Sequence, residues 1–170
     1  MKGANMDYFF NAEEVFHIAV LIEQNGEKFY RHLETLVDEA TTKEICLRLA
    51  RQEHEHKLLF EKLLSDLVNS KSLQYNLKDL PQENLSYMKS LSESNVFARA
   101  LDLDAISKKI KNTRDAITTA LGFEKDTIVF FLQMKKFTRP EWGQAEINNL
   151  IEQEEEHIRI LSGLLSEKQQ

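Results

Sequence analysis

The chain has 170 residues, 42% hydrophobic and 29% charged, which is long enough for a single domain, residues 1–170, with a buried core. Its net charge of -6 argues against nucleic acid as the main partner, and no apolar run approaches the roughly 18 residues of a membrane span. The single cysteine, Cys46, excludes a disulfide framework and a cysteine-rich metal site, so we expect a protein of the reducing cytoplasm.

The first part of the chain predicts two long helices, over residues 12–37 and 41–68. Apolar residues recur along both at steps of three and four, which is the pattern of a bundle helix with one buried face. The break between the helices is only a few residues long, so they should form an antiparallel hairpin. Polar residues interrupt the apolar stripes at Glu23 in the first helix and at Glu53 and His56 in the second.

Serine, asparagine and proline break this periodicity over residues 69–111, where we expect a long crossover with short helices near 82–91 and 104–110. Two further long helices are predicted over 113–137 and 139–166, the last with Thr138 and Glu141 as a capping box and Pro140 in its first turn. The four long helices predict an all-α fold, a four-helix bundle of two antiparallel hairpins. The long crossover lets the third helix start at the far end of the bundle.

The polar residues inside the apolar stripes form an internal repeat. In each half of the chain, a single Glu is followed thirty residues later by Glu-x-x-His, and the two copies are offset by 101 residues. They are Glu23, Glu53 and His56 in the first half and Glu124, Glu154 and His157 in the second. The repeat predicts a pseudo-two-fold axis with one half-set on either side of it.

Four carboxylates in apolar stripes need compensating charge. Burial of one unpaired carboxylate costs several kcal/mol, and four close together repel one another. No Lys or Arg occupies the stripes, so buried ion pairs do not explain the pattern. Two divalent cations would balance four carboxylates and two neutral histidines. An oxygen-rich donor set with one nitrogen per metal and no thiolate suits iron or manganese better than structural zinc.

Other candidates are weaker or ambiguous. A third Glu-x-x-His, at Glu14 and His17, lies off the stripe and lacks a matching copy, so we interpret it as accidental. His17, His32 and His54 are expected at the surface by helix phase. Tyr30 lies two turns after Glu23 on the same face, and it is either a core aromatic residue or a hydroxyl donor to a ligand carboxylate.

Gln52 and Gln153 each directly precede the Glu of a Glu-x-x-His pair. Two interpretations are open for them. Each can orient the histidine of the opposite hairpin, or each can lie on exposed helix surface, which we favour at this point.

Four blocks of sequence surround these residues: Ala19–Tyr30 (AVLIEQNGEKFY), Arg51–His56 (RQEHEH), Phe123–Ile128 (FEKDTI) and Glu154–His157 (EEEH). They resemble the rubrerythrin-like branch of the ferritin-like superfamily, and bacterioferritins share the same ligand pattern. The resemblance covers nearly the whole chain. It implies a ferritin-like bundle with two iron ions, with manganese or a mixed pair as the alternative. It also implies that Glu23 and His56 are terminal ligands of one iron, Glu124 and His157 of the other, and that Glu53 and Glu154 bridge them.

Three departures from the family pattern qualify this resemblance. The chain has one cysteine, whereas full rubrerythrins carry a rubredoxin domain with four, so a separate electron donor such as a rubredoxin is expected. Thr127 stands where typical rubrerythrins have an additional Glu. His54 stands where bacterioferritin has its haem-binding Met, so no haem is expected.

The resemblance therefore predicts a di-iron oxidoreductase of oxidative-stress defence that reduces hydrogen peroxide or O2. Two alternatives remain: a ferroxidase that handles Fe(II) as substrate, and a non-catalytic bundle stabilised by metal. A homodimer or larger homo-oligomer is expected.

Overall fold

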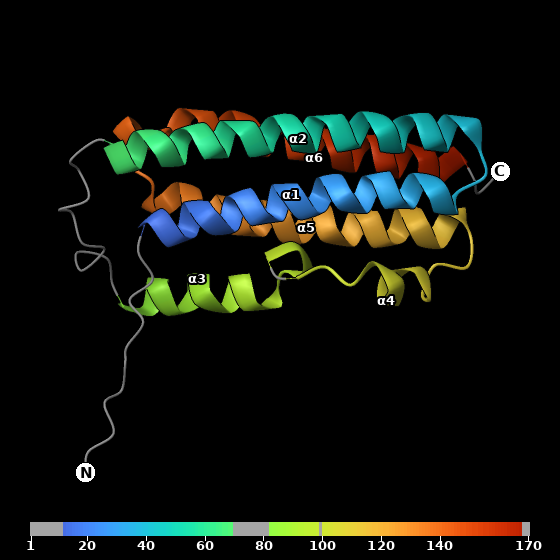
Figure 1. Cartoon of the computed structure of the whole chain (residues 1–170), viewed down its shortest axis with the longest axis horizontal. Coiled ribbons are helices and arrows are strands. Elements are labelled where there is room, and N and C mark those ends of the chain that lie inside the picture. The colour runs from blue at the N-terminus through green and yellow to red at the C-terminus, as the bar shows by residue number, and fades with distance from the viewer. Residues whose placement is uncertain (1–11, 70–81, 99, 168–170) are drawn as a thin grey trace, which may run out of the picture.

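The computed structural model of the chain describes residues 12–69, 82–98 and 100–167, and those residues form helices and connecting segments without a strand. Four long helices make the bundle: α1 (Ala12–Leu36), α2 (Ala40–Asn69), α5 (Thr113–Phe137) and α6 (Gln144–Glu167). The crossover contributes α3 (Gln82–Ser94), the 3-10 turn η3 (Val96–Ala98) and α4 (Leu103–Ser107) (Figure 1). The prediction of an all-α four-helix bundle is confirmed.

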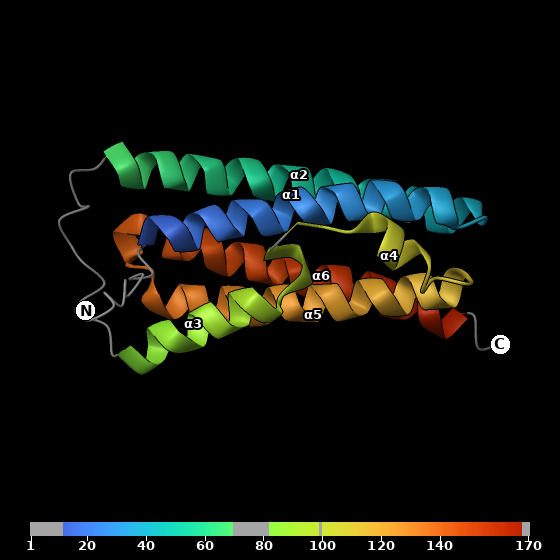
Figure 2. The same cartoon turned by 60° about the horizontal axis from the view of Figure 1, so that its bottom comes forward.

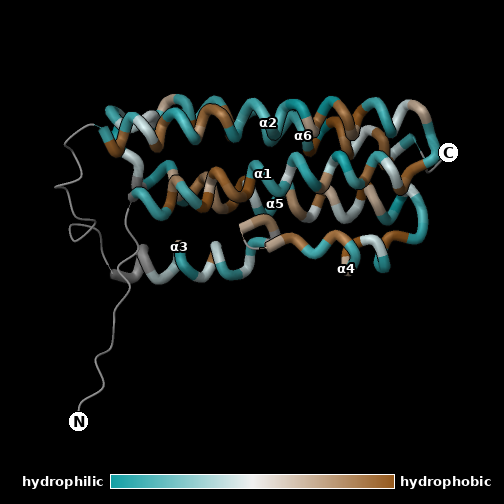
Figure 3. Tube along the Cα trace, in the orientation of Figure 1, coloured by the Kyte–Doolittle hydropathy of each residue, from teal (hydrophilic) through white to brown (hydrophobic). Residues whose placement is uncertain are grey.

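The predicted stripes form the core. Along α1, every stripe residue is buried, and hydrophilic and hydrophobic positions alternate along all four long helices in Figure 3. The stripe consists of Phe16, Ala19, Glu23, Gly26, Tyr30 and Leu33 in α1 and of Val37 directly after its end. A stripe with a period near 3.6 residues buries one face of a bundle helix, so the carboxylate that interrupts the stripe is buried with it.

The two hairpins pack with α1 beside α5 and α2 beside α6 (Figures 1 and 2). The crossover lies along the α1–α5 side, where η3 and α4 contact α1 and α3 contacts α5. Asn25 Nδ2 donates a hydrogen bond of 2.7 Å to the carbonyl oxygen of Phe97, and His32 Nε2 lies 2.6 Å from Ser107 Oγ. These contacts hold the crossover against α1, and they leave the α2–α6 side as the opposite face of the bundle.

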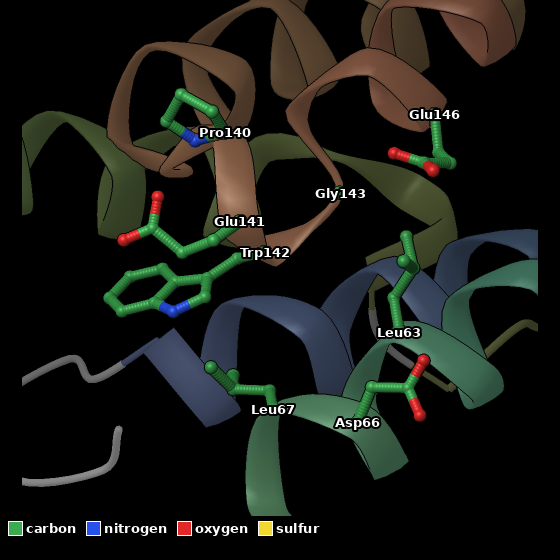
Figure 4. A pocket seen from close by; sticks show the side chains of 8 residues that line it. All are labelled: Leu63, Asp66, Leu67, Pro140, Glu141, Trp142, Gly143 and Glu146. Carbon is green, nitrogen blue, oxygen red and sulfur yellow. The ribbon is translucent and has the colours of Figure 1, made fainter. Parts of the chain in front are cut away.

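The start of the fourth helix differs from the prediction. Pro140–Trp142 form the 3-10 turn η4, and α6 begins at Gln144 instead of residue 139. The reason is Gly143, whose φ of 90° is left-handed, and a Cβ built there would lie 2.5 Å from Leu63 Cδ2 (Figure 4). A capping box at Thr138 and Glu141 therefore does not start this helix, because the chain must first turn past Leu63.

The same turn borders a surface pocket of about 300 Å³ with Asp66, Glu141 and Glu146 on its walls (Figure 4). None of the six residues of the repeat lines it. Among the described residues, no helix has the length and apolar character needed to cross a membrane.

Candidate metal centre

The six residues of the repeat converge in the middle of the bundle, one from each of α1 and α5 and two from each of α2 and α6. Every one of them is buried, with at most 3% of its surface exposed. Helix periodicity explains the convergence, because Glu and His three residues apart lie on the same face, one turn from each other.

The ligand atoms fall into two overlapping groups. Glu23, Glu53, His56 and Glu154 form one group, and Glu53, Glu124, Glu154 and His157 form the other, with the offered atoms of each group within 4.8 Å of one another. Glu53 and Glu154 belong to both groups, whereas each remaining residue belongs to one. This division matches the implied roles, with two shared carboxylates between two terminal Glu–His pairs.

Both imidazoles present Nδ1 to the carboxylates. His56 Nδ1 lies 2.8 Å from Glu154 Oε1 and 3.6 Å from Glu23 Oε2. His157 Nδ1 lies 2.9 Å from Glu154 Oε2, 3.1 Å from Glu53 Oε1 and 3.5 Å from Glu124 Oε1. The rings stack with centroids 5.6 Å apart and an interplanar angle of 18°. Nε2 of each ring therefore points away from the cluster.

The cluster contains most of the buried side-chain nitrogen and oxygen atoms that lack a hydrogen-bond partner in the described part of the chain. Both carboxylate oxygens of Glu23 and of Glu154 are among them, as is Nδ1 of both histidines, because the contacts of 2.8 and 2.9 Å between Nδ1 and Glu154 lack hydrogen-bond geometry. Buried polar atoms are normally hydrogen-bonded, so a group of them facing one another is the arrangement of a metal site. The donor set of carboxylate oxygens and imidazole nitrogens, without a thiolate, fits metal ions that prefer oxygen and nitrogen ligands.

The two outer carboxyl groups of the cluster, Glu23 and Glu124, bind protons more tightly than usual when no cation is present. Burial and then the nearby Glu53 and Glu154 raise the pKa of Glu23 well above its ordinary value. Burial and then the same carboxylates raise the pKa of Glu124 to about 8. Divalent cations would displace these protons, so metal binding should release them to solvent.

The charge balance is different at the centre of the cluster. Burial would raise the pKa of Glu154, but His157 and His56 lower it below its ordinary value. Burial would lower the pKa of both histidines, but Glu154 and the other nearby carboxylates raise it. Without metal, protonation of the two imidazoles beside Glu154 is therefore favoured.

The rubrerythrin family's sequence profile matches residues 14–165. The chain belongs to the rubrerythrin family. It is also similar to a solved structure from Thermotoga maritima, provisionally described as a ferritin-like diiron-carboxylate protein, with a TM-score of 0.67 and 20% identity over 94% of this chain and 97% of that one. At that identity, the likeness supports the shared fold. No curated protein matches the chain.

Tyr30 supplies a hydroxyl to this rubrerythrin-family centre. Its Oη donates a hydrogen bond to Glu124 Oε1, and the residue is 1% exposed. Burial and the nearby Glu124 raise the pKa of Tyr30, so the phenol keeps its proton. The two interpretations of Tyr30 are both correct, because the side chain is a core aromatic residue and a donor to a carboxylate of the cluster.

Gly26 makes room for a carboxylate of the cluster, which its position in the sequence did not reveal. A Cβ built on it would lie 2.6 Å from Glu53 Oε2, so the carboxylate occupies the space that a side chain would take. The available signal was a glycine inside a buried helical stripe, where glycine usually reflects close packing. The matching residue in the second half is Thr127, which is 2% exposed.

Gln153 corrects the favoured interpretation of the glutamine pair. Its Oε1 lies 3.2 Å from His56 Nε2, and the residue is only partly exposed. Position by helix phase alone suggested solvent exposure, but α2 and α6 lie side by side and cover both glutamines in part. The other glutamine of the pair, Gln52, has a buried Oε1 without a hydrogen-bond partner.

The remaining histidines lie outside the cluster. The side chain of His17 is 60% exposed and lies 3.6 Å from Glu13, and Nδ1 of His54 lies 2.9 Å from Glu27 Oε2. His32 contacts Ser107 of the crossover. The accidental interpretation of the third Glu-x-x-His therefore agrees with where His17 lies.

Proposed function

We propose that this rubrerythrin-family protein holds two iron ions in the cluster and reduces hydrogen peroxide with electrons from a separate donor. The observation that carries the proposal is the pair of overlapping donor groups, in which Glu53 and Glu154 are common to both. Such a pair of shared carboxylates is what two adjacent metal ions need and what a single structural ion does not. Manganese or a mixed pair would use the same donors.

The donors divide the work. Glu23 with His56, and Glu124 with His157, would be the terminal ligands of the two ions, and Glu53 and Glu154 would lie between them. Bound as two Fe(II), the iron pair would supply the two electrons that, with two protons, convert hydrogen peroxide into two water molecules. The carboxylate-rich set favours the oxidised ions, so the return of electrons from the donor should limit turnover.

Other side chains protect and orient the centre. Tyr30 keeps its proton and holds one oxygen of Glu124 through a hydrogen bond. Phe29, Phe97 and Phe123 pack with ring centroids 4.7–5.5 Å apart and close the α1–α5 side with the help of the crossover. An apolar lining of this kind strengthens the electrostatic interactions inside the centre, because it lowers the local dielectric constant.

The single thiol of the chain cannot provide a second iron centre as an electron donor. The single cysteine, Cys46, is buried, and its pKa is raised to about 11 by burial and then by Glu34. One protonated thiol cannot form the four-cysteine iron site of a rubredoxin. An external donor of that kind is therefore part of the proposal.

Oxidation of Fe(II) for iron handling is the second candidate. Thr127 favours it, because this buried position has no carboxylate to offer as a seventh ligand. The donor set then equals the one that the resemblance to bacterioferritins implies. In this case Fe(II) is the substrate, and the product Fe(III) leaves the centre.

The test is anaerobic loading with two equivalents of Fe(II), followed by stopped-flow mixing with hydrogen peroxide or O2 at equal concentration. We expect faster oxidation by peroxide, and repeated turnover only when a reductant such as reduced rubredoxin is added. Faster reaction with O2, together with a mineral core in a large assembly by native mass spectrometry, would contradict the peroxidase proposal and support iron handling. Failure of the chain to bind Fe(II) would contradict both.

A further inference from the structure

The second ring nitrogen of each histidine in the cluster is turned away from the carboxylates, and that of His56 meets Gln153 of α6. Nδ1 of each ring faces the carboxylates at 2.8–3.6 Å, so Nε2 points outward. The crossover packs on the α1–α5 side, as Figures 1 and 2 show, so it does not supply the partner for these nitrogens. What lies next to Nε2 therefore decides which nitrogen carries the proton.

One partner is already in place. His56 Nε2 lies 3.2 Å from Gln153 Oε1, and an amide oxygen only accepts hydrogen bonds. Nε2 of His56 is thus the donor, and in the neutral ring Nδ1 is left with a free lone pair. That lone pair faces Glu23 and Glu154, so His56 could share a metal ion with these two carboxylates.

The corresponding contact in the other half, between His157 and Gln52, is not formed. His157 Nε2 and Gln52 Oε1 are each buried without a hydrogen-bond partner. Gln52 is related to Gln153 by the same offset of 101 residues that relates His56 to His157. A donor and an acceptor that are both unsatisfied, in the position that the repeat assigns to a contact, point to a bond that forms when the ring is held by metal.

We propose that Gln52 and Gln153 are positioning residues that each accept the Nε2 hydrogen of the histidine on the opposite hairpin, and thereby hold both rings with Nδ1 directed at the metal pair. The inference rests on the proposed metal site, and it goes beyond the six ligands. Partners of this kind fix the tautomer and the orientation of ligating histidines.

The chemistry of an amide suits this cluster. A carboxylate in the same position would also accept the hydrogen bond, but it would add a negative charge beside four carboxylates that two divalent ions already balance. An amide orients the ring without that charge. It also ties α2 to α6, so that each half of the ligand set is oriented by the other hairpin.

The experiment uses the full chain loaded with Co(II), a paramagnetic ion that is stable in air. Proton NMR in H2O and D2O would follow the exchangeable Nε2 hydrogens of the ligating histidines, and titration would give the Co(II) affinity. The variants are Gln153→Leu and Gln52→Leu, with Gln24→Leu as the matched control on an exposed position of α1. Gln153→Glu keeps a hydrogen-bond acceptor at the position where Gln153→Leu has none, and it therefore tests rescue.

In the unaltered chain, we expect two shifted resonances that exchange slowly with solvent. Gln153→Leu should make the His56 resonance exchange at least several-fold faster, Gln52→Leu should do so for the His157 resonance, and each should weaken Co(II) binding by roughly tenfold. Gln153→Glu should restore slow exchange, and Gln24→Leu should change neither quantity. If a Leu variant does not fold, Gln153→Asn and Gln52→Asn, whose amides are too short to reach the ring, take its place.

Three results would overturn the inference. Exchange and affinity in both glutamine variants could match the unaltered chain. The losses could be equal in Gln24→Leu, which would indicate a general effect on the helices. Gln153→Glu could fail to restore slow exchange. Absence of Co(II) and Fe(II) binding by the unaltered chain is a different outcome, because it would remove the proposed metal site itself.

Discussion

The α1–α2 and α5–α6 hairpins provide the same three ligand types at the same spacing, but they surround them differently. Tyr30 of α1 donates a hydrogen bond to Glu124, whereas the matching residue of α5 is Phe131, which has no hydroxyl. As a result, Glu124 has a donor, and both oxygens of its counterpart Glu23 lack one. The two metal positions of the proposed centre should therefore be unequal even though their ligands would be alike.

A second difference concerns the space beside the shared carboxylates. Gly26 of α1 leaves room for Glu53 Oε2, and the matching residue of α5 is the larger Thr127. The repeat thus preserves the charges of the centre and varies the neighbours that set their position. This is the expected behaviour of a repeat, because the proposed metal pair would need all six donors and each hairpin meets a different environment.

The largest effect should come from loss of a shared carboxylate, since Glu53 and Glu154 each belong to both groups of donors. Glu53→Ala should lower the bound Fe(II) from about two ions per chain to less than one, because the lost group serves both groups of donors. Anaerobic loading followed by metal analysis measures this. Glu55→Ala, at an exposed position two residues away, is the matched control and should retain full loading. Equal losses from the two variants would contradict the assignment of ligands by helix face.

Metal removal should expose the raised pKa values of the terminal carboxylates. The pKa of Glu124, about 8, exceeds the unfolded value near 4.3, so the folded metal-free chain binds more protons than the unfolded chain between these values. Its free energy of unfolding should fall from pH 5 to pH 8 by on the order of a few kcal/mol. The histidines act in the same direction above about pH 6.5, because their pKa values are also raised in the folded state.

Urea unfolding at several pH values, with and without bound metal, tests this prediction. The metal-loaded chain should keep its stability or gain some as pH rises, because cations hold the carboxylates in the ionised form. Glu23→Gln combined with Glu124→Gln should make the pH dependence of the metal-free chain shallower, most clearly below about pH 6.5, where the histidines contribute least. Parallel curves for loaded and metal-free protein would count against a shared carboxylate cluster.

The contrast between Gly26 and Thr127 leads to a smaller effect. Gly26→Ala should displace the Glu53 carboxylate and weaken Fe(II) binding by roughly tenfold, which is the size of effect seen when a ligand's support is altered. Gly122→Ala is the matched control, because no atom lies within 4 Å of the Cβ that it would add. That control should bind metal normally and gain up to about 1 kcal/mol of stability from helix propensity. Normal binding by Gly26→Ala would mean that Glu53 relocates freely.

The smallest effect is expected from Tyr30→Phe, which makes the two hairpins alike at this position. Loss of the donor to Glu124 should bring the two stepwise Fe(II) affinities within a few-fold of each other, on the scale of about 1 kcal/mol for one hydrogen bond. Isothermal titration under anaerobic conditions resolves the two steps. If the steps stay as far apart as in the unaltered chain, Tyr30 is not the source of the inequality.

The sequence alone determined the bundle and its six candidate ligands. The spacing of Glu53 and His56 puts both on one helix face, and the offset of 101 residues requires the same of Glu154 and His157. These conclusions depend on helix periodicity, which is local. The start of α6 was predicted too early, because the left-handed turn at Gly143 is required by its contact with Leu63 from another helix.

Only the tertiary structure decided how the ligands are supported. The hydrogen bond from Tyr30 to Glu124, the room that Gly26 leaves for Glu53, and the contact between Gln153 and His56 each join different helices. Their geometry depends on the distance and rotation between packed helices, which no periodicity along one helix contains. The repeat therefore specifies which atoms meet in the centre, and the packing of the hairpins determines which neighbour holds each of them.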